Sequence, residues 1–409
     1  MEGRFPVWAA GPPGMDLADP GLYTGTAHLE MWREARARHP VAWTESPLAG
    51  GFWSVTTHRE CEEVLGRPDT FISEQGMRLG SNPAGVRAAA GRMLVVSDGA
   101  AQARLRAAHQ VWLGSRSVMS QGVVLRERVA ARLDELLARG AAFDAVGELT
   151  ARVPQWVLLD MLGVPRQDWD SLTVTMAEAF DHTDPGPEAE AARTAAHARI
   201  FAYFDELLDM RREQPGDDIV SALAHANPGG TPLTDEEILL NCDGLMNGGL
   251  ETVPHALAGA LLLFARQPGL WERLRSEPRL IGTTVEEIVR WTSPALHAMR
   301  TAVRETSIGD VTVRSGDRVV LWYPSANLDE RVFPNPDTFL PDRRPNPHIA
   351  FGAGAHYCVG AALARLELRC LLEVMAGRVA TVELAGEPVR RASNFLQGFD
   401  RLEVVMKPH

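Results

Sequence analysis

The sequence predicts a mainly α-helical protein with a minor β portion, and three observations support this. Apolar residues recur at three- and four-residue spacing over residues 125–137, 153–162 and 191–212, which is typical of amphipathic helices. Short alternating runs, typical of strands, follow at 311–313, 317–322, 378–384 and 401–405. No repeat or low-complexity linker divides the chain. We therefore expect a single unit over residues 1–409, with β subregions near 40–57, 305–325 and 378–407.

The individual elements are read from local signals in chain order. A helix is expected at 29–38, strands at 40–43 and 51–56, and another helix from Arg59. Residues 181–187 are rich in Asp, Pro and Gly and predict a surface loop between two helices. A long helix should begin at Thr234, which forms a capping box with Glu237, and should end near residue 266. A helix at 284–291 and an irregular stretch at 333–347 precede the last strands.

Composition excludes several classes of protein. The chain has 409 residues, of which 45% are hydrophobic and 23% charged, as in ordinary globular proteins. A net charge of −12 argues against a general nucleic-acid binder, because such proteins cluster Lys and Arg on one face. No run reaches the roughly 18 apolar residues that span a bilayer, and residues 1–14 lack the apolar centre of a signal peptide. We expect a cytoplasmic protein without a membrane segment.

Four cysteines occur, at positions 61, 242, 358 and 370. Their wide spacing favours reduced thiols over a disulfide framework or a CxxC zinc site. Cys358 stands out because it ends the run Phe351-Gly-Ala-Gly-Ala-His-Tyr-Cys-Val-Gly360, which leads directly into a helix at 361–375. A thiol at a helix N-terminus should have a lowered pKa, and Gly352, Gly354 and Gly360 allow positive φ and close approach to a flat ligand.

Three other interpretations of this loop remain open on its residues alone. Cys358 could be a buried structural cysteine after an ordinary glycine-rich turn. A phosphate-binding loop would need the Lys-Ser/Thr ending, which is missing. A nucleophilic cysteine would need a base, and His356 is very close in sequence to serve as one.

Two further motifs lie far from Cys358 in the sequence. Glu287-Ile-Val-Arg290 places an acid and a base on one face of a helix, where they can pair. Gly248-Gly-Leu-Glu-Thr252 interrupts the middle of the long helix with two glycines that each cost about 1 kcal/mol of helix stability. The glycines indicate either close helix packing or a widened groove, in which the Thr252 hydroxyl takes the Gly248 carbonyl. Pro254 adds to the interruption because it cannot donate to Leu250.

The loop Phe351-Gly-x-Gly-x-His356-x-Cys358-x-Gly360 resembles the haem-binding loop of the cytochrome P450 family, and the resemblance extends over nearly the whole chain. It implies a triangular helical prism that holds haem b between the long central helix and the helix after the cysteine. Cys358 would be the axial ligand of the haem iron and Phe351 would pack against it. Gly352, Gly360 and Gly248 would border the haem. Gln102, Arg106, Arg300 and His356 match family positions for partners of the haem propionates, with Gln102 in place of a histidine.

The other motifs take roles from the same resemblance. Glu251 and Thr252 resemble the acid–alcohol pair that delivers protons to bound dioxygen and organises water. Glu287, Arg290 and Arg343, the last in Phe339-x-x-x-Arg343, resemble a buried cluster that serves folding and haem incorporation.

By analogy, segments at 76–96, 175–181, 245–251, 295–299 and 394–397 would line a substrate pocket for an apolar small molecule of appreciable size. The substrate-binding candidates are Phe180, Leu245, Leu296, His297, Met299, Phe395 and Leu396, with His297 and Gln397 as polar groups that orient the substrate.

The implied activity is that of a soluble bacterial haem-thiolate monooxygenase that hydroxylates or epoxidises its substrate, plausibly in secondary-metabolite biosynthesis. The chain carries no flavin, nicotinamide or iron–sulfur module, so a ferredoxin and a ferredoxin reductase would supply electrons. Arg104, Arg344, Arg365 and Arg369 could form a basic patch for the ferredoxin. We expect a monomer. Two alternatives stay open, a peroxide-driven or non-oxygenating haem-thiolate enzyme and a non-catalytic haem protein that binds ligands.

Overall fold

The computed structural model describes residues 16–181 and 186–409. The start of the chain at 1–14, examined above for a signal peptide, lies outside the described residues. The predicted loop at 181–187 is described only at its two ends.

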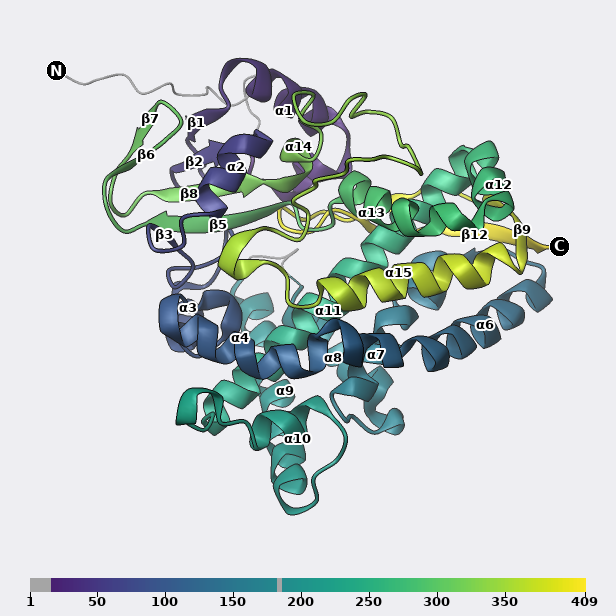
Figure 1. Ribbon diagram of the computed structural model, residues 1–409, viewed down its shortest axis with the longest axis horizontal. Helices are drawn as coiled ribbons and strands as arrows, with labels where there is room; N and C mark the ends of the chain where they lie inside the picture. Colours follow the sequence, from purple (N-terminus) through teal and green to yellow (C-terminus); the bar gives the residue numbers. More distant parts are fainter. Residues whose placement is uncertain (1–15, 182–185) are drawn as a thin grey trace.

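Helices form the greater part of the fold (Figure 1). The α-helices are α1 Ala27–Arg38, α2 His58–Leu65, α3 Pro83–Ala89, α4 Gly99–Leu113, α5 Ser115–Ser120, α6 Gly122–Arg139, α7 Arg152–Met161, α8 Trp169–Ala179, α9 Pro187–Glu213, α10 Ile219–Ala224, α11 Asp235–Arg266, α12 Pro268–Ser276, α13 Ile281–Thr292, α14 Tyr323–Ala326 and α15 Ala361–Ala376. All the helices expected from periodicity are present.

In the part of the chain that the structure describes, the strands form one larger sheet and three small ones. They are β1 Val41–Thr44, β2 Phe52–Val55, β3 Phe71–Ile72, β4 Phe143–Asp144, β5 His297–Ala302, β6 Thr306–Ile308, β7 Val311–Val313, β8 Arg318–Trp322, β9 Val379–Leu384, β10 Val389–Arg390, β11 Phe399–Arg401 and β12 Glu403–Pro408. The five-stranded sheet has the order β1-β2-β8-β5-β3. It therefore joins two of the predicted β subregions that are far apart in the sequence.

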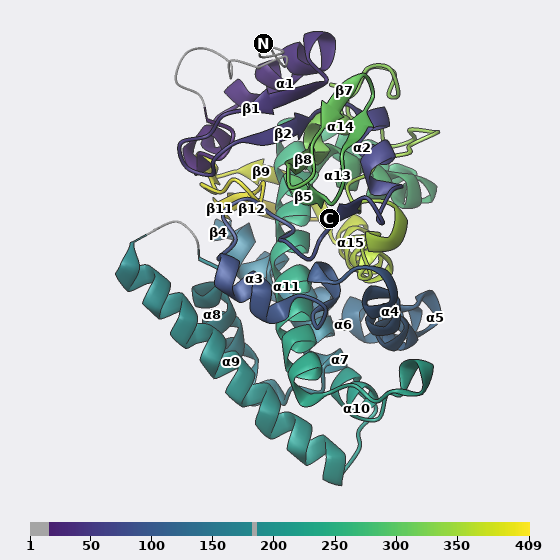
Figure 2. The same ribbon diagram turned by 90° about the vertical axis from the view of Figure 1, so that its left-hand side faces the viewer.

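The long helix α11 passes through the centre of the molecule (Figure 2). Its predicted capping box is present, because Thr234 Oγ1 accepts from the Glu237 N–H at 3.2 Å and Glu237 Oε2 accepts from the Thr234 N–H at 2.9 Å. The helix continues through Pro254. It is long and apolar enough to cross a membrane, yet 67% of its most apolar window is buried inside the protein, as in a core helix. Its buried residues join the principal hydrophobic core.

Two predictions about strands need correction. The strand expected at 401–405 is split at Leu402 into β11 and β12, because the Leu402 N–H donates to Asp144 Oδ1 at 3.0 Å instead of to a ladder partner. Strands β3, β4 and β5 were not predicted. The first two are only two residues long, and β5 is buried at every position, so it shows no alternation of polar and apolar residues.

Candidate functional site

A cavity of about 340 Å³ lies between α11 and α15 and is also lined by the segment after β3, by α4 and by β5. Its wall contains residues from all the motifs singled out above except the Glu287 cluster. The predicted residues that line it are Gln102, Arg106, Leu245, Gly248, Glu251, Thr252, His297, Arg300, Phe351, Gly352, His356, Cys358, Gly360, Phe395 and Leu396.

The cysteine loop is held in shape by its own backbone. The Cys358 N–H donates to the Phe351 carbonyl at 2.8 Å, and α15 begins three residues after the cysteine. Gly352 and Gly354 have φ of +67° and +66°, as the glycine pattern predicts. A side chain at Gly354 would also meet the Leu65 carbonyl oxygen at 2.4 Å. Gly360 has an ordinary negative φ, and its Cβ position lies 3.9 Å from Cys358 Sγ.

The electrostatics of Cys358 differ from the prediction. Its thiol borders the cavity, and enclosure by the surrounding chain raises its pKa. The Gly360 N–H and the charges of Arg106 and Arg365 counter only part of this effect. The expectation of a lowered pKa is therefore wrong for the side chain by itself, because desolvation by the surrounding chain outweighs these effects even though Cys358 is exposed to the cavity. Coordination by a metal ion would deprotonate such a thiol outright.

The two glycines in the middle of α11 serve different purposes. A Cβ at Gly249 would lie 2.4 Å from Leu158 Cδ2, so this glycine allows α7 to pack closely against α11. A Cβ at Gly248 would meet nothing within 4 Å, and Gly248 lines the cavity. Close packing is thus confirmed for Gly249, which also lines the cavity, and the widened groove at Gly248 stays a prediction.

The acid and the alcohol that follow these glycines both face the cavity. Thr252 Oγ1 donates to the Gly248 carbonyl oxygen at 3.0 Å, as predicted. Burial raises the pKa of the Glu251 carboxyl to about 7, and the positive charges of Arg391 and Arg78 oppose this increase. Glu251 can therefore change its protonation state near neutral pH, which a proton relay requires.

The four predicted propionate partners lie together on the cavity wall. Gln102 Nε2 donates to the Ala355 carbonyl at 2.7 Å, and Arg106 donates to the Tyr357 carbonyl at 2.8 Å. Arg300 donates to the Met299 carbonyl and is nearly buried, which lowers its pKa. The contacts of Gln102 and Arg106 hold these side chains beside the cysteine loop, whereas Arg300 bonds within its own strand β5.

His356 is held on the same side of the cavity by an acidic neighbour. Its Nε2 lies 3.0 Å from Asp98 Oδ1 and 3.3 Å from Ser73 Oγ. The site therefore combines two arginines, an amide and an imidazole, which is a donor set suited to carboxylates.

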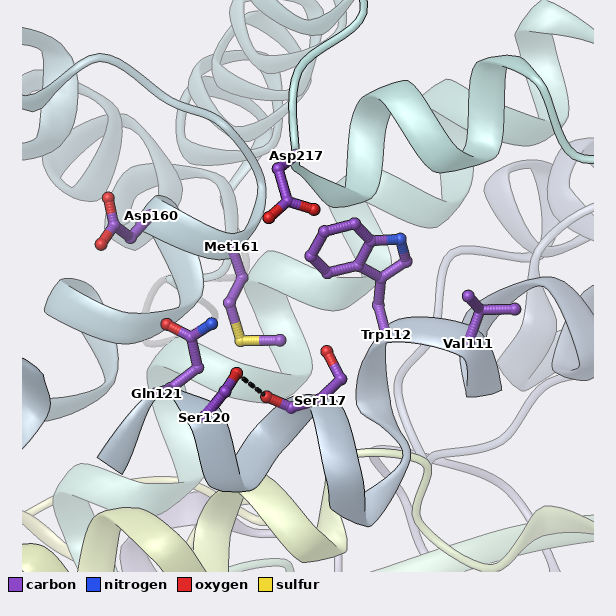
Figure 3. A pocket seen from close by; sticks show the side chains of 8 residues that line it. All are labelled: Val111, Trp112, Ser117, Ser120, Gln121, Asp160, Met161 and Asp217. Carbon is purple, nitrogen blue, oxygen red and sulfur yellow. Dashed lines mark hydrogen bonds between the residues drawn. The ribbon is translucent and has the colours of Figure 1, made fainter. Parts of the chain in front are cut away.

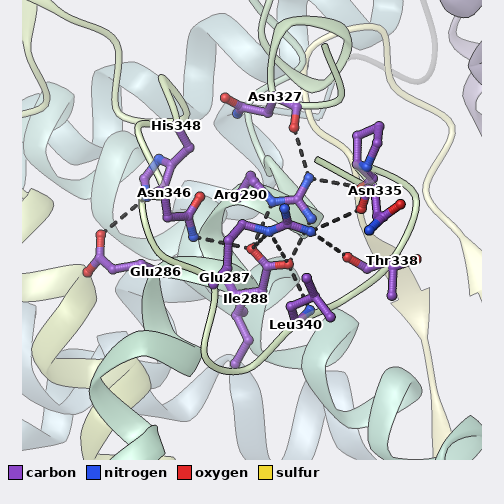
Figure 4. A network of polar contacts seen from close by, with 12 residues as sticks. Glu286, Glu287, Ile288, Arg290, Asn327, Asn335, Thr338, Leu340, Asn346 and His348 are labelled. Atoms are coloured by element: carbon purple, nitrogen blue, oxygen red, sulfur yellow. Dashed lines mark hydrogen bonds and ion pairs between the residues drawn. The ribbon is translucent and has the colours of Figure 1, made fainter. Parts of the chain in front are cut away.

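The Glu287 cluster is buried where α13 packs against the irregular segment (Figure 4). Arg290 makes two bonds of 2.8 Å to the Glu287 carboxylate, and Arg343 Nε lies 3.0 Å from both of its oxygens. Arg290 also donates to the Asn327 carbonyl directly after α14, and Arg343 donates to the Thr338 carbonyl in the irregular stretch. Three sequence-distant segments are joined in this way, and the predicted buried cluster is present.

Three substrate-binding candidates do not reach the cavity wall. Leu296 and Met299 pack into a separate core cluster next to the larger sheet, and Phe180 packs edge-on against His197 with ring centroids 4.8 Å apart. Ala298 and Arg300 line the cavity together with His297 at the start of β5, whereas Met299 packs into the other cluster. A position close in sequence to the motif residues therefore did not predict whether a side chain faces the cavity.

The polar candidates act mainly as structural partners. Burial lowers the pKa of His297 to about 3, and its Nε2 accepts from the Leu79 N–H at 3.0 Å. Gln397 donates to the Thr292 carbonyl at 3.0 Å and does not line the cavity. Leu245, Phe395 and Leu396 lie on the wall as expected.

Arg78, Asn247 and Glu367 also line the cavity, and sequence reasoning did not single them out. Glu367 is almost completely buried, and burial raises the pKa of its carboxyl well above the usual range. Arg78 lies within the segment predicted to line the pocket, but nothing in its local sequence marks it. Glu367 could have been found from the sequence, because it is a charged residue at a position of the amphipathic helix α15 that faces the interior.

Two of the four arginines of the predicted basic patch are paired within the protein. Arg104 pairs with the buried Glu237, and Arg365 pairs with Glu286 at 2.7 Å and with the Tyr357 hydroxyl at 3.0 Å. Only Arg344 and Arg369 of the four are exposed.

A second hollow, of about 480 Å³, lies between α5, α7 and the loop before α10 (Figure 3). Its wall carries Ser117, Ser120, Asp160 and Asp217 beside Trp112. None of the sequence motifs contributes to it. Within residues 16–181 and 186–409, no group of three metal-ligating side chains occurs either. The chemistry predicted from the sequence is therefore concentrated in the cavity between α11 and α15.

Comparison with known proteins agrees with this geometry. The family model described as "Cytochrome P450" matches residues 187–376. The putative cytochrome P450 126 of Mycobacterium tuberculosis is 36% identical over 98% of this chain and 99% of its own, and linalool 8-monooxygenase of Pseudomonas putida is 33% identical over 96% and 99%. The crystal structure of P450 OxyD, involved in the biosynthesis of vancomycin-type antibiotics, superposes with a TM-score of 0.88 at 38% identity and covers 97% of this chain and 100% of its own.

The fold and the cavity define a haem-thiolate oxidoreductase of the monooxygenase class. The chain belongs to the cytochrome P450 family. Proteins of this family bind haem through a cysteine thiolate. The residues present fit that cofactor: a thiol on one wall, a glycine with open space before it on the wall formed by α11, and carboxylate-binding donors at the side.

Proposed function

We propose that this protein is a P450 monooxygenase in which Cys358 is the axial thiolate ligand of haem b and Glu251 and Thr252 deliver protons. The observation that carries the proposal is that Cys358, Gly248, Glu251 and Thr252 border the same cavity. When bound, the haem supplies the activation of dioxygen and the oxidation of a substrate carbon. Gln102, Arg106, Arg300 and His356 would hold its propionates, and Phe351, Gly352 and Gly360 would form the wall around the sulfur.

The protein's own residues then have distinct tasks. Glu251 takes up a proton from the solvent side and passes it toward Thr252, because its pKa of about 7 allows both protonation states. The Thr252 hydroxyl donates to the Gly248 carbonyl, so its lone pairs can order water inside the cavity. Glu287, Arg290 and Arg343 support the fold beneath the loop and thereby haem incorporation.

We propose an apolar small molecule as substrate, hydroxylated or epoxidised, with secondary-metabolite biosynthesis as its setting. Leu245, Phe395 and Leu396 on the cavity wall support an apolar substrate. Similarity to OxyD of vancomycin-type biosynthesis supports the setting.

Electrons would come from a separate ferredoxin and ferredoxin reductase, with Arg344 and Arg369 as exposed cations for an acidic partner. We further propose a cytoplasmic monomer in which the whole chain forms one domain. The principal core, whose residues extend from Leu94 to Met406, supports the single domain.

Turnover with labelled dioxygen tests the proposal. Purified haem-loaded protein, a surrogate ferredoxin and its reductase are incubated with a panel of terpenoid and aromatic compounds, and products are analysed by mass spectrometry. The expected result is a product that carries one labelled oxygen atom. Cys358→Ser should lose the red-shifted Soret band of the reduced carbon monoxide complex. Product formation that requires added peroxide and does not use labelled dioxygen would contradict the proposal and favour a peroxide-driven enzyme.

A further inference from the structure

One arginine on α15 contacts the cysteine loop at two places. The guanidinium carbon of Arg365 lies 4.6 Å from the centre of the Phe351 ring, and its Nη1 donates to the Tyr357 hydroxyl at 3.0 Å. The Phe351 carbonyl in turn accepts from the Cys358 N–H at 2.8 Å, and Tyr357 directly precedes the cysteine. The charge of Arg365 is therefore held against both loop residues that adjoin Cys358, one by a hydrogen bond and the other along the chain.

Glu286 on α13 fixes the remaining edge of this guanidinium. Arg365 Nε and Nη2 donate to its two carboxylate oxygens at 2.7 Å and 2.9 Å, which is the paired geometry of an arginine and a carboxylate. Glu286 Oε2 also lies 3.2 Å from His348 Nε2 (Figure 4), and the His348 ring packs against Phe351 with centroids 5.8 Å apart. Burial would raise the pKa of Glu286, but the bonds to His348 and Arg365 lower it to about 2, so it is a carboxylate at neutral pH. The positive member of this pair thus contacts the cysteine loop, and the negative member belongs to α13.

The charge of Arg365 also acts on the sulfur. Together with the charge of Arg106, it favours the thiolate form of Cys358 and counters part of the effect of burial. The sequence placed Arg365 in a surface patch for a ferredoxin, but its side chain is only 32% exposed. Each of its three nitrogens donates to Glu286 or to Tyr357. Its contacts are therefore directed to the cysteine loop and not to the solvent.

We propose that the positive charge of Arg365 raises the reduction potential of the haem bound at Cys358, and that Glu286 limits how strongly this charge acts. The inference rests on the proposed function, because Cys358 is the ligand assigned there. Reduction adds one negative charge to the site, so a nearby cation stabilises the reduced form more than the oxidised form. Groups that surround a metal ligand tune the potential of the metal in this way. A carboxylate paired with the cation weakens the effect.

Two other roles for Arg365 give different expectations. If it only braces the loop, loss of either member of the pair would loosen the same contacts and move the potential in one direction or not at all. If it only attracts a ferredoxin, its loss would weaken ferredoxin binding and leave the potential unchanged. A charge that acts on the site requires opposite shifts when Arg365 and Glu286 are neutralised in turn.

The experiment measures the reduction potential of the haem-loaded protein by dithionite titration with mediators, at a single pH and without any redox partner. Arg365→Met should lower the equilibrium constant for reduction by about threefold to tenfold, because the charge is partly screened by solvent. Glu286→Gln keeps the shape of the side chain but removes the opposing charge, so it should raise the same constant by about threefold to tenfold. A tenfold change equals about 59 mV for a one-electron couple.

Two variants serve as controls. Arg365→Lys keeps the charge beside Glu286 and should restore most of the potential that Arg365→Met loses. Arg126→Met removes a cation of similar exposure that pairs with Glu373, which lies about 12 Å farther along α15 than Arg365, and it should leave the potential unchanged. If Arg365→Met does not retain haem, Glu286→Gln decides alone, because an unchanged or lowered potential in that variant contradicts the proposed charge effect.

Shifts of the same sign in Arg365→Met and Glu286→Gln, or no shift in either, would overturn the inference. The reduced carbon monoxide complex of the unchanged protein reports separately on the proposed function. A complex without the thiolate spectrum would show that the proposed function fails, whereas a thiolate spectrum with unmoved potentials would overturn only the role of Arg365.

Discussion

Thr252 Oγ1 donates to the carbonyl oxygen of Gly248 at 3.0 Å in the middle of α11, and both residues line the cavity that contains Cys358. Gly248 has no side chain and the space before it is open. The hydroxyl is therefore held by its own helix at the edge of this space, where it can order water without further support from the substrate.

The role proposed for this hydroxyl is tested by replacing Thr252 with Ala. The variant should bind haem and substrate normally, but it should divert electrons from product to hydrogen peroxide, because water near the reacting centre is no longer ordered. The measurement is the ratio of product and peroxide to nicotinamide cofactor oxidised. Thr252→Ser keeps the hydroxyl and is the matched control. Unchanged coupling in Thr252→Ala would remove Thr252 from the proposed relay.

The neighbouring glycines should respond in opposite ways to the same substitution. Gly249→Ala places a methyl group 2.4 Å from Leu158 Cδ2 and should destabilise the fold by about 1–3 kcal/mol through overpacking. Gly248→Ala places its methyl group in open space and should stabilise the helix by up to about 1 kcal/mol, while it alters ligand affinity. Urea unfolding of both variants measures the free energies. Equal destabilisation by the two would contradict the division of roles.

Motifs whose partners lie close in sequence were predictable. The cysteine loop, the Thr252–Gly248 bond and the Glu287–Arg290 pair all connect residues within about two helical turns or one turn of loop. Their geometry follows from helix periodicity and from glycine conformations, which are properties of local sequence.

Features that depend on tertiary packing were not predictable. Met299 faces away from the cavity because the register of β5 against β8 fixes its direction, and that pairing joins residues about twenty positions apart. The raised pKa of Cys358 follows from enclosure by distant segments, which the helix-dipole argument omits. Arg78 gains its position from bonds of its neighbours to β5. In each case the deciding contact comes from another part of the chain.

The buried cluster predicts a large loss of stability for Glu287→Gln. Arg290 and Arg343 both bond to this carboxylate inside the protein, so neutralising it leaves two buried cations with weakened partners. The free energy of unfolding should fall by about 3–5 kcal/mol, and haem content after expression should fall with it. Glu383→Gln breaks the exposed pair with Lys407 and should change neither quantity measurably. Normal haem content in Glu287→Gln would contradict the role in haem incorporation.

Glu251 predicts a pH dependence of stability. Its pKa is raised by burial to about 7 in the folded protein, against about 4.3 for a free glutamate. The folded state therefore binds more protons than the unfolded state between these values, and the protein loses stability as the pH rises through this window. A glutamine at position 251 does not titrate. The free energy of unfolding of Glu251→Gln minus that of the wild type should therefore increase by up to about 3 kcal/mol between pH ~4.5 and ~7. Parallel curves for the two proteins would show that the folded pKa is not raised.

The same titration should appear in turnover. A relay must be protonated to deliver a proton, so the coupling of electron use to product should be high below about pH 7 and fall above it as Glu251 ionises. Burial sets this pKa, and Arg78 and Arg391 oppose the rise while Asp181 adds to it. Arg391→Met should therefore move the midpoint to higher pH, whereas Glu251→Gln should show low coupling with no midpoint in this range. A wild-type midpoint that persists in Glu251→Gln would assign the titration to another group and exclude Glu251 from the relay.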